Sequence, residues 1–254
     1  MIRKVADFCN RILEKAFGLR IQPSADKRLA SSRNWIFLIT DTKLVLDVGA
    51  NQGQWASRIR KDGYMHKIVS FEPSEAFNSL VDRSKTDLNW DCRKLAVSNI
   101  SSEVELYSAS NGNLSTSILK PKEILNQGFN LEFDKKFIAK AVTIDDFFST
   151  YPQSLFYLKL DVQGAEMKAL QGAKKFLENC IAVEFESALV DLYEGETTHY
   201  QISDWLRRNN FEPFQIVITH WDRKLRTISI DSIFVKNEFL NMGDARVESM
   251  ETGK

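Results

Sequence analysis

From residue 43 onward, short apolar runs alternate with stretches of helical periodicity, and this alternation constrains the fold more than any other feature. It is typical of βαβ units, in which parallel strands are buried by helices on both faces of the sheet. The sequence therefore predicts a Rossmann-like, doubly wound α/β fold with a mostly parallel sheet. Strands are expected over 43–48, 66–71, 91–97, 104–107, 137–142, 155–160, 181–185, 214–219 and 229–235, and helices over 52–60, 74–84 and 199–209 and from Ala165.

The residues before this alternation are predicted to form a helical extension over 1–35. Within it, residues 1–18 read as an amphipathic helix that ends at Gly18. The extension holds eight Lys and Arg against three Asp and Glu, so it is locally basic. Such a helix packs on its own domain, pairs with a second copy in a homodimer, or rests on a membrane surface. One α/β domain is expected over 36–240, followed by a polar tail over 241–254.

Charge balance and apolar runs exclude several classes of protein. Lys and Arg number 34, as do Asp and Glu, so the chain lacks the basic excess of a general nucleic-acid binder. The longest apolar runs, such as 35–39, fall far short of the ~20 residues of a membrane-spanning helix, and no secretory signal is visible. We expect a cytoplasmic protein without stable membrane insertion. Cys9, Cys92 and Cys180 are expected to be reduced thiols, and the three histidines lack zinc-site spacing.

A glycine loop follows the first strand, in Leu44-Val45-Leu46-Asp47-Val48-Gly49-Ala50-Asn51-Gln52-Gly53. Gly49 permits a sharp turn and close approach of a ligand, and Gly53 opens the next helix. The dinucleotide fingerprint needs a glycine where Ala50-Asn51 stands, and the Asp47 carboxylate would repel a pyrophosphate. This loop suits a cofactor with an ammonium group and no phosphate, such as S-adenosylmethionine (SAM).

A second acidic residue supports the same cofactor. Glu72 ends the second strand and is followed by Pro73, which fixes the turn into the next helix. In folds of this type, an acid at the tip of the second strand accepts hydrogen bonds from both ribose hydroxyls. Asp47 and Glu72 at consecutive strand ends therefore predict an adenosine-containing ligand.

With these residues the chain resembles the FkbM family of SAM-dependent methyltransferases, over about residues 43–236. The resemblance rests on Asp47-Val48-Gly49-Ala50-Asn51-Gln52-Gly53, Phe71-Glu72-Pro73, Leu95-Ala96-Val97-Ser98, Val142-Thr143-Ile144-Asp145-Asp146-Phe147, Leu158-Lys159-Leu160-Asp161-Val162-Gln163-Gly164-Ala165-Glu166 and Asp231-Ser232-Ile233-Phe234. It implies a seven-stranded methyltransferase sheet with an antiparallel C-terminal strand, and cofactor contacts from Ala96 and Val97. It also implies O-methylation of a sugar, glycan or glycosylated metabolite, and a role in polysaccharide biosynthesis.

The candidate catalytic residues follow the strand over 155–160. Asp161 stands at its tip, beside the expected cofactor crevice, and is the candidate to remove the acceptor proton, directly or through a bound metal. Lys159 lies on the same face of the strand and would favour ionised Asp161. Glu166 is the third candidate. Gln163 replaces a glutamate of the family pattern, so a role for this position as a base or metal ligand is not expected.

Other polar residues suggest further roles. Glu184 and Glu186 near another strand end are candidate oxygen ligands for Mg²⁺, although no complete ligand set can be named. His199 is a second candidate base. The insertion over 108–136, rich in Ser, Asn and Gly, reads either as a lid or substrate loop or as surface decoration.

Three alternatives to the O-methyltransferase stay open on sequence alone. An NAD-dependent oxidoreductase or epimerase shares the fold class, but the missing middle glycine and Asp47 argue against it. A non-catalytic SAM-binding module is supported only by Gln163. Nucleic-acid methylation is disfavoured because the chain has no Asn/Asp-Pro-Pro-Tyr motif and no basic stripe.

Overall fold

The computed structural model describes residues 23–125, 130–133, 135–149, 154–222 and 224–240, together with Leu13, Lys15 and Met242. The helix expected over 1–18 and the tail over 241–254 therefore lie almost entirely outside the described residues. The same holds for Cys9, whereas Cys92 and Cys180 are free thiols.

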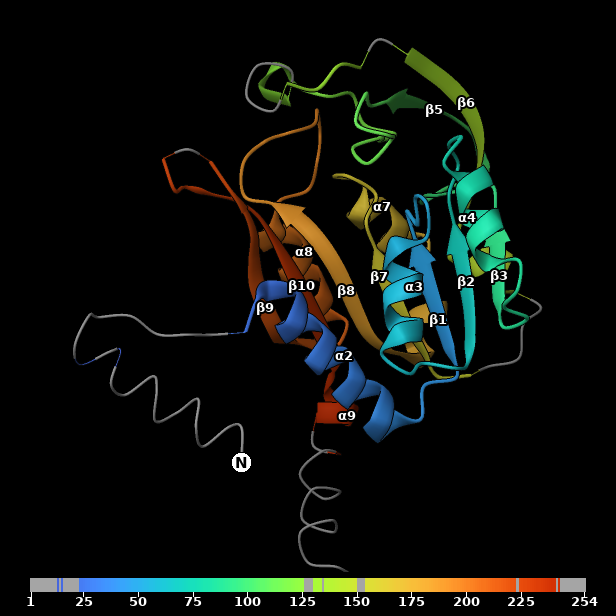
Figure 1. The fold of residues 1–254 in the computed structure, drawn as a ribbon, viewed down its shortest axis with the longest axis vertical. Helices are drawn as coiled ribbons and strands as arrows, with labels where there is room; N and C mark the ends of the chain where they lie inside the picture. The colour runs from blue at the N-terminus through green and yellow to red at the C-terminus, as the bar shows by residue number, and fades with distance from the viewer. Residues whose placement is uncertain are drawn as a thin grey trace, which may run out of the picture.

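A seven-stranded sheet forms the centre of the molecule, in the order β3-β2-β1-β7-β8-β10-β9 (Figure 1). Its strands are β1 (Leu44–Val48), β2 (Lys67–Phe71), β3 (Trp90–Arg93), β7 (Phe156–Leu160), β8 (Cys180–Ala188), β9 (Phe211–Trp221) and β10 (Thr227–Lys236). β10 runs antiparallel to both β8 and β9, and the other pairings are parallel. The predicted mostly parallel sheet with an antiparallel C-terminal strand is confirmed.

Helices cover both faces of this sheet. One face packs on α2 (Ala25–Thr40), α3 (Gln54–Lys61) and α4 (Phe77–Ser84), and the other on α6 (Ile144–Phe147), α7 (Glu166–Gln171) and α8 (His199–Arg208). A 3₁₀ turn lies over Phe176–Asn179, and the short α9 spans Asn237–Leu240. All five residues of β1 and of β7 are buried, as expected for central strands covered on both sides.

The helix α2 spans the position between residues 35 and 36 where the sequence suggested a boundary. Leu29 and Ile36 on this helix belong to the core cluster beneath the sheet. Arg33 is buried in the same region, with 1% of its surface exposed. Residues 25–40 therefore pack as part of the α/β core. Separately, no helix of the described chain is long and apolar enough to span a membrane.

The third expected strand, over 91–97, is divided in the structure. β3 ends at Arg93 because its parallel partner β2 ends at Phe71, opposite it in the register. The chain then leaves the main sheet, and Ala96–Val97 form β4 of a separate three-stranded sheet with β6 (Lys135–Val142) and β5 (Ser102–Ser108). This small sheet carries the insertion over the edge of the main sheet (Figure 1).

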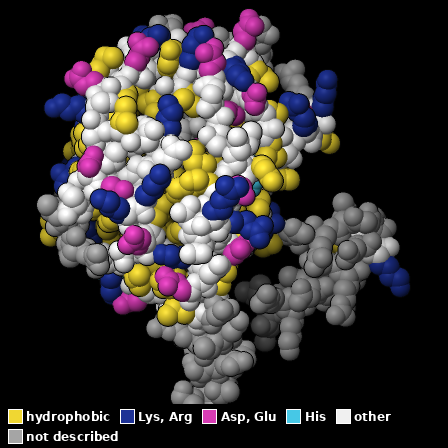
Figure 2. All heavy atoms as spheres, turned by 180° about the vertical axis from the view of Figure 1, so that it is seen from behind, with side chains coloured by type: hydrophobic (Ala, Val, Ile, Leu, Met, Phe, Trp, Pro, Cys, Tyr) yellow, Lys and Arg dark blue, Asp and Glu magenta, His cyan; other side chains and the backbone are white. Residues whose placement is uncertain are grey.

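The face seen in Figure 2 shows acidic and basic side chains side by side.

Candidate active site

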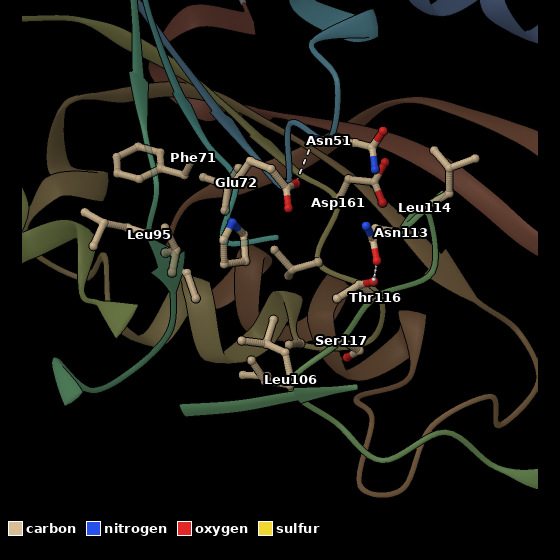
Figure 3. A pocket seen from close by; sticks show the side chains of 18 residues that line it. Asn51, Phe71, Glu72, Leu95, Leu106, Asn113, Leu114, Thr116, Ser117 and Asp161 are labelled. Atoms are coloured by element: carbon tan, nitrogen blue, oxygen red, sulfur yellow. Dashed lines mark hydrogen bonds between the residues drawn. The ribbon is translucent and has the colours of Figure 1, made fainter. Parts of the chain in front are cut away.

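A cavity of about 70 Å³ lies at the carboxyl ends of β1, β2 and β7. Its lining unites residues that the sequence analysis named separately: Gly49, Asn51, Glu72, Pro73, Ala96, Val97 and Asp161. Figure 3 shows apolar Phe71 and Leu95 at one end, Asn51 and Asp161 at the other, and Glu72 between them. The cavity thus has an apolar end and a polar end, and we call it the cofactor cavity below.

The glycine turn brings β1 against the tip of β7. Gly49 has a φ of +79°, and its amide and that of Ala50 both donate to the carbonyl of Phe71 at 3.0 Å. A Cβ atom on Gly49 would lie 1.9 Å from the backbone oxygen of Asp161. Only glycine therefore fits here, because the adjacent strand end leaves no room for a side chain. Gly53, also at positive φ, instead packs on Leu80 and Trp90, away from the cavity.

Glu72 is held rigidly at the middle of the cofactor cavity. Its Oε2 accepts from the amide of Asn51 and its Oε1 from the amide of Ser74, both at 2.8 Å. Burial raises the pKa of this carboxyl group, against the effect of these hydrogen bonds. Each carboxylate oxygen can accept a second hydrogen bond, so two hydroxyl groups of a ligand can still be bound.

Asp47 and Ala50 do not line the cofactor cavity. They face a larger neighbouring cavity of about 510 Å³, which also includes Lys159. The Asp47 carboxyl group accepts from the Ser70 hydroxyl at 3.0 Å, and burial raises its pKa to about 7. Asp47 therefore gains and loses its proton near neutral pH, whereas the sequence argument treated it as a permanent charge.

Asp161 and Lys159 form a partly buried pair at the polar end. Asp161 Oδ2 lies 3.5 Å from Lys159 Nζ, and its Oδ1 accepts from the Gln163 side-chain amide at 2.8 Å. Burial lowers the pKa of Lys159, but the surrounding carboxylates, Asp161 first among them, outweigh this effect and raise it. Lys159 thus remains a cation, and both it and the Gln163 amide contact the Asp161 carboxylate.

Gln163 connects this pair to β8. The residue adopts a φ of +52°, and its side-chain amide lies 2.8 Å from Asp161 and 3.5 Å from Glu186. Its backbone carbonyl accepts from the Ser117 hydroxyl at 2.7 Å. The amide therefore bridges two carboxyl groups that a glutamate at this position would repel.

Glu166 supports the turn between β7 and α7. Its Oε1 accepts from the amides of Val162 and Gly164, at 3.0 and 3.3 Å. Burial raises its pKa to about 8. It does not line the cofactor cavity but another cavity of about 300 Å³. The structure thus separates Glu166 from Asp161, with which the sequence analysis grouped it.

The insertion over 108–136 lies against the cofactor cavity. Asn113, Leu114, Thr116 and Ser117 line it, and Asn51 donates from its side-chain amide to the carbonyl of Gly112 at 3.1 Å. The segment therefore forms a wall of the cavity, which agrees with the reading as a lid or substrate loop.

Glu184 is engaged in a structural network. Its carboxylate receives the Arg33 guanidinium at 2.8 Å, the Trp55 indole at 3.2 Å and the Tyr157 hydroxyl at 2.7 Å. Among the described residues, no group of three or more His, Cys, Asp or Glu side chains is arranged to hold a metal ion. The expectation that Glu184 is a free metal ligand is not supported, because an arginine neutralises it.

His199 is likewise occupied on both ring nitrogens. Nδ1 bonds the Ser187 hydroxyl at 2.8 Å and Nε2 the Ser203 hydroxyl at 3.1 Å, and the ring stacks on Phe185. The second candidate base is thus packed into the structure. His220, which the sequence analysis gave no role, instead lines the 300 Å³ and 510 Å³ cavities together with Glu186. His220 lies far in sequence from the motifs, so no pattern in the sequence indicated that it lines these cavities.

Comparison with known proteins gives similar proteins in sequence and in structure. The 2-O-methyltransferase NoeI of Sinorhizobium fredii is 27% identical over 206 residues, which cover 77% of this chain and 83% of the relative. Among solved structures, an rRNA methylase from Streptococcus thermophilus gives a TM-score of 0.46 at 9% identity, covering 85% of this chain and 98% of that one. Magnesium protoporphyrin IX methyltransferase from Synechocystis gives 0.44 at 10% identity, covering 92% and 96%.

These two structural similarities are too low to bear on substrate or mechanism. The family comparison is decisive, because the model described as the methyltransferase FkbM domain matches residues 47–213, more than half of the chain. The protein therefore belongs to the FkbM methyltransferase family and is a methyltransferase.

Proposed function

We propose that the protein is a SAM-dependent O-methyltransferase that methylates a hydroxyl group of a sugar, glycan or glycosylated metabolite. The observation that carries this proposal is the placement of Glu72 and Asp161 around one cavity, at the tips of β2 and β7, the two strands that flank β1. The name of the relative NoeI, a 2-O-methyltransferase, supports oxygen as the acceptor atom. The sugar is inferred from the family resemblance and from the polar insertion beside the cavity.

The residues of the cofactor cavity fit SAM in three respects. Phe71, Leu95 and Val97 offer an apolar end suited to an adenine ring, and Glu72 offers the acceptor for two ribose hydroxyls. Asp161, at the polar end, suits the positive charge of the sulfonium and ammonium groups. When bound, SAM supplies a methyl group activated for displacement by a nucleophile.

Asp161 is the proposed base for the acceptor hydroxyl. A neutral sugar hydroxyl is a weak nucleophile, so removal of its proton accelerates transfer. The Gln163 amide at 2.8 Å and the Lys159 ammonium at 3.5 Å hold the carboxylate in place. Lys159 is thus a positioning residue. Glu166 is another, because it accepts hydrogen bonds from the Val162 and Gly164 amides and so fixes the turn that follows Asp161.

Two measurements test this function. Calorimetry should show SAM and its demethylated product binding in the micromolar range while NAD does not bind, and labelled SAM should transfer its methyl group to a saccharide. Asp161→Asn should lose roughly 10²- to 10⁴-fold in turnover at saturating SAM, and it should bind SAM more weakly because the carboxylate also faces the positive charge of the cofactor. Asp82→Asn is the matched control, because Asp82 is 76% exposed, pairs with Lys85 on the surface and does not line the cofactor cavity.

The outcomes separate the alternatives. Binding of NAD without SAM would indicate an oxidoreductase, and SAM binding without transfer to any acceptor would indicate a non-catalytic module. Near-normal turnover of Asp161→Asn would remove Asp161 as the base while leaving the methyltransferase itself intact.

A further inference from the structure

A second cavity, of about 300 Å³, lies beside the cofactor cavity and has no assigned ligand. Its apolar walls include Leu131 and Ile228, and its polar lining includes Gln163, Glu186 and His220. This combination of apolar surface and side-chain hydrogen-bonding groups is typical of sites for small polar ligands. We call it the acceptor cavity.

At two places, residues close in sequence line the acceptor cavity and the cofactor cavity respectively. In the insertion, Ser115 faces the acceptor cavity while the adjacent Thr116 faces the cofactor cavity. At the tip of β7, Gln163 faces one cavity and Asp161 the other, joined by the hydrogen bond of 2.8 Å. A molecule in the acceptor cavity therefore lies next to the proposed base.

The acidic side chains that line the acceptor cavity outnumber its basic ones. Glu186 and Glu196 line it, beside Glu166, whose raised pKa of about 8 leaves it largely protonated near neutral pH, and none of its described lining residues is a lysine or arginine. Two lysines of the adjoining segment are already paired: Lys120 with Glu194 at 2.7 Å, and Lys122 with Asp191 at 3.0 Å. A phosphate or carboxylate in this cavity would meet carboxyl groups without a lysine or arginine of the lining to neutralise it.

Two backbone donors near the cavity are already engaged. The helix α8 begins near the cavity, since Thr197 belongs to the lining. The first turn of that helix is closed by a capping box, in which Thr198 accepts from the Gln201 amide and Gln201 accepts from the Thr198 amide. These amides are therefore not available to an anion in the way that open helix N-termini are.

We infer that this cavity holds the acceptor, and that the acceptor is a saccharide without phosphate or carboxylate groups; the inference rests on the proposed function. A sugar activated as a nucleoside diphosphate is excluded by the charge of the lining. The substrate is consequently supplied by a glycosyl transfer, which releases the nucleotide, and methylation follows that transfer.

Binding of matched ligands tests the inference in the presence of demethylated SAM. For glucose, galactose and N-acetylglucosamine, the methyl glycoside, the 1-phosphate and the uridine diphosphate derivative are compared by ligand-observed NMR and by methyl transfer from labelled SAM. We expect at least one methyl glycoside to bind and to be methylated. Its phosphorylated forms should bind at least about tenfold more weakly, because of like-charge repulsion.

A charge variant identifies the cause. Glu196→Gln should strengthen binding of the phosphorylated forms by about tenfold while leaving the glycoside nearly unchanged, since the amide oxygen can still accept from the Tyr193 amide. Glu123→Gln is the control, because Glu123 is an exposed carboxylate of the adjoining segment and is not among the residues of the cavity.

Three results would overturn the inference. Equal or tighter binding of the nucleotide sugars, with methyl transfer to them, would refute the acceptor class and leave the O-methyltransferase intact. No binding of any form of any sugar, with demethylated SAM bound normally, would remove saccharides from this cavity. An unchanged preference in Glu196→Gln would show that charge in the lining does not determine the selection.

Discussion

Substitution of Gly49 by alanine tests whether the glycine turn is shaped by the neighbouring strand. The added Cβ would lie 1.9 Å from the Asp161 carbonyl oxygen and 2.7 Å from its carbon, which are backbone atoms. They are held by the hydrogen bond from the Asp161 amide to the Val48 carbonyl at 2.9 Å. To reach an ordinary contact, the tips of β1 and β7 must separate by more than about 1 Å, a shift typical of overpacked sites.

The cost has two parts that can be estimated separately. A non-glycine residue in the left-handed region costs about 1–2 kcal/mol, and overpacking against a rigid neighbour costs about 1–3 kcal/mol. Gly49→Ala should therefore lower the free energy of unfolding by about 2–5 kcal/mol. Gly63→Ala is the matched control: Gly63 has a φ of +102° but no atom lies within 4 Å of its added Cβ, so only the first cost applies.

Urea denaturation of the two variants gives the difference, and calorimetry with demethylated SAM gives the effect on the cavity. We expect Gly49→Ala to lose at least about tenfold in affinity, because Asp161 moves with its backbone, and Gly63→Ala to bind normally. Equal destabilisation of the two variants would refute the reasoning, since it would show that the tip of β7 yields freely.

Three further predictions concern other parts of the structure. Arg33→Met should destabilise the fold by about 3–5 kcal/mol in urea denaturation, because Glu184 is left buried without its cation. The double variant with Glu184→Gln should recover part of this loss. If the losses in free energy of unfolding of the two single variants simply add in the double variant, the pairing is contradicted. Burial raises the pKa of folded Asp47 to about 7, so between roughly pH 4 and 7 the folded chain holds a proton that the unfolded chain has released, and stability falls as the pH rises. Asp47→Asn should therefore weaken this dependence in denaturation at the two ends of the window, and an unchanged slope would show that Asp47 titrates normally. Deletion of residues 111–117 removes part of the cofactor cavity wall, so affinity for demethylated SAM should fall by about tenfold along with methyl transfer. Unchanged affinity with lost transfer would leave the segment as a substrate loop, and only unchanged affinity and transfer together would reduce it to surface decoration.

The sequence predicted the main sheet and its ligand-binding edge because both follow from local order. Parallel strands joined by helices end at one edge, so Glu72 and Asp161 had to approach each other there. Strand order and the small sheet β4-β6-β5 depend on pairings that no local pattern reveals. The division of the strand expected over 91–97 follows from where its neighbour β2 ends, which is a property of another segment.

The contacts that the sequence could not predict join distant segments. Arg33 and Glu184 are 151 residues apart. From sequence alone, an arginine on a helix is expected to be exposed to solvent, because its buried partner cannot be identified. The contact between Gln163 and Glu186 likewise joins segments that are distant in sequence. The position of His220 beside the acceptor cavity also depends on such a long-range arrangement. A residue type suggests what a side chain can do, whereas its partner depends on the complete fold.

The order of the last three strands sets a limit on how the chain can be shortened. The family match ends at residue 213, inside β9, and therefore omits β10, which lies between β8 and β9 and bonds to both. At its other end the match begins at residue 47 and omits α2, the source of the cation beside Glu184. A fragment cut to 47–213 would lose the strand that joins β9 to the sheet and would bury an unpaired carboxylate. The stretch by which the family is recognised is thus shorter than the unit that folds, and both flanks are integral to that unit.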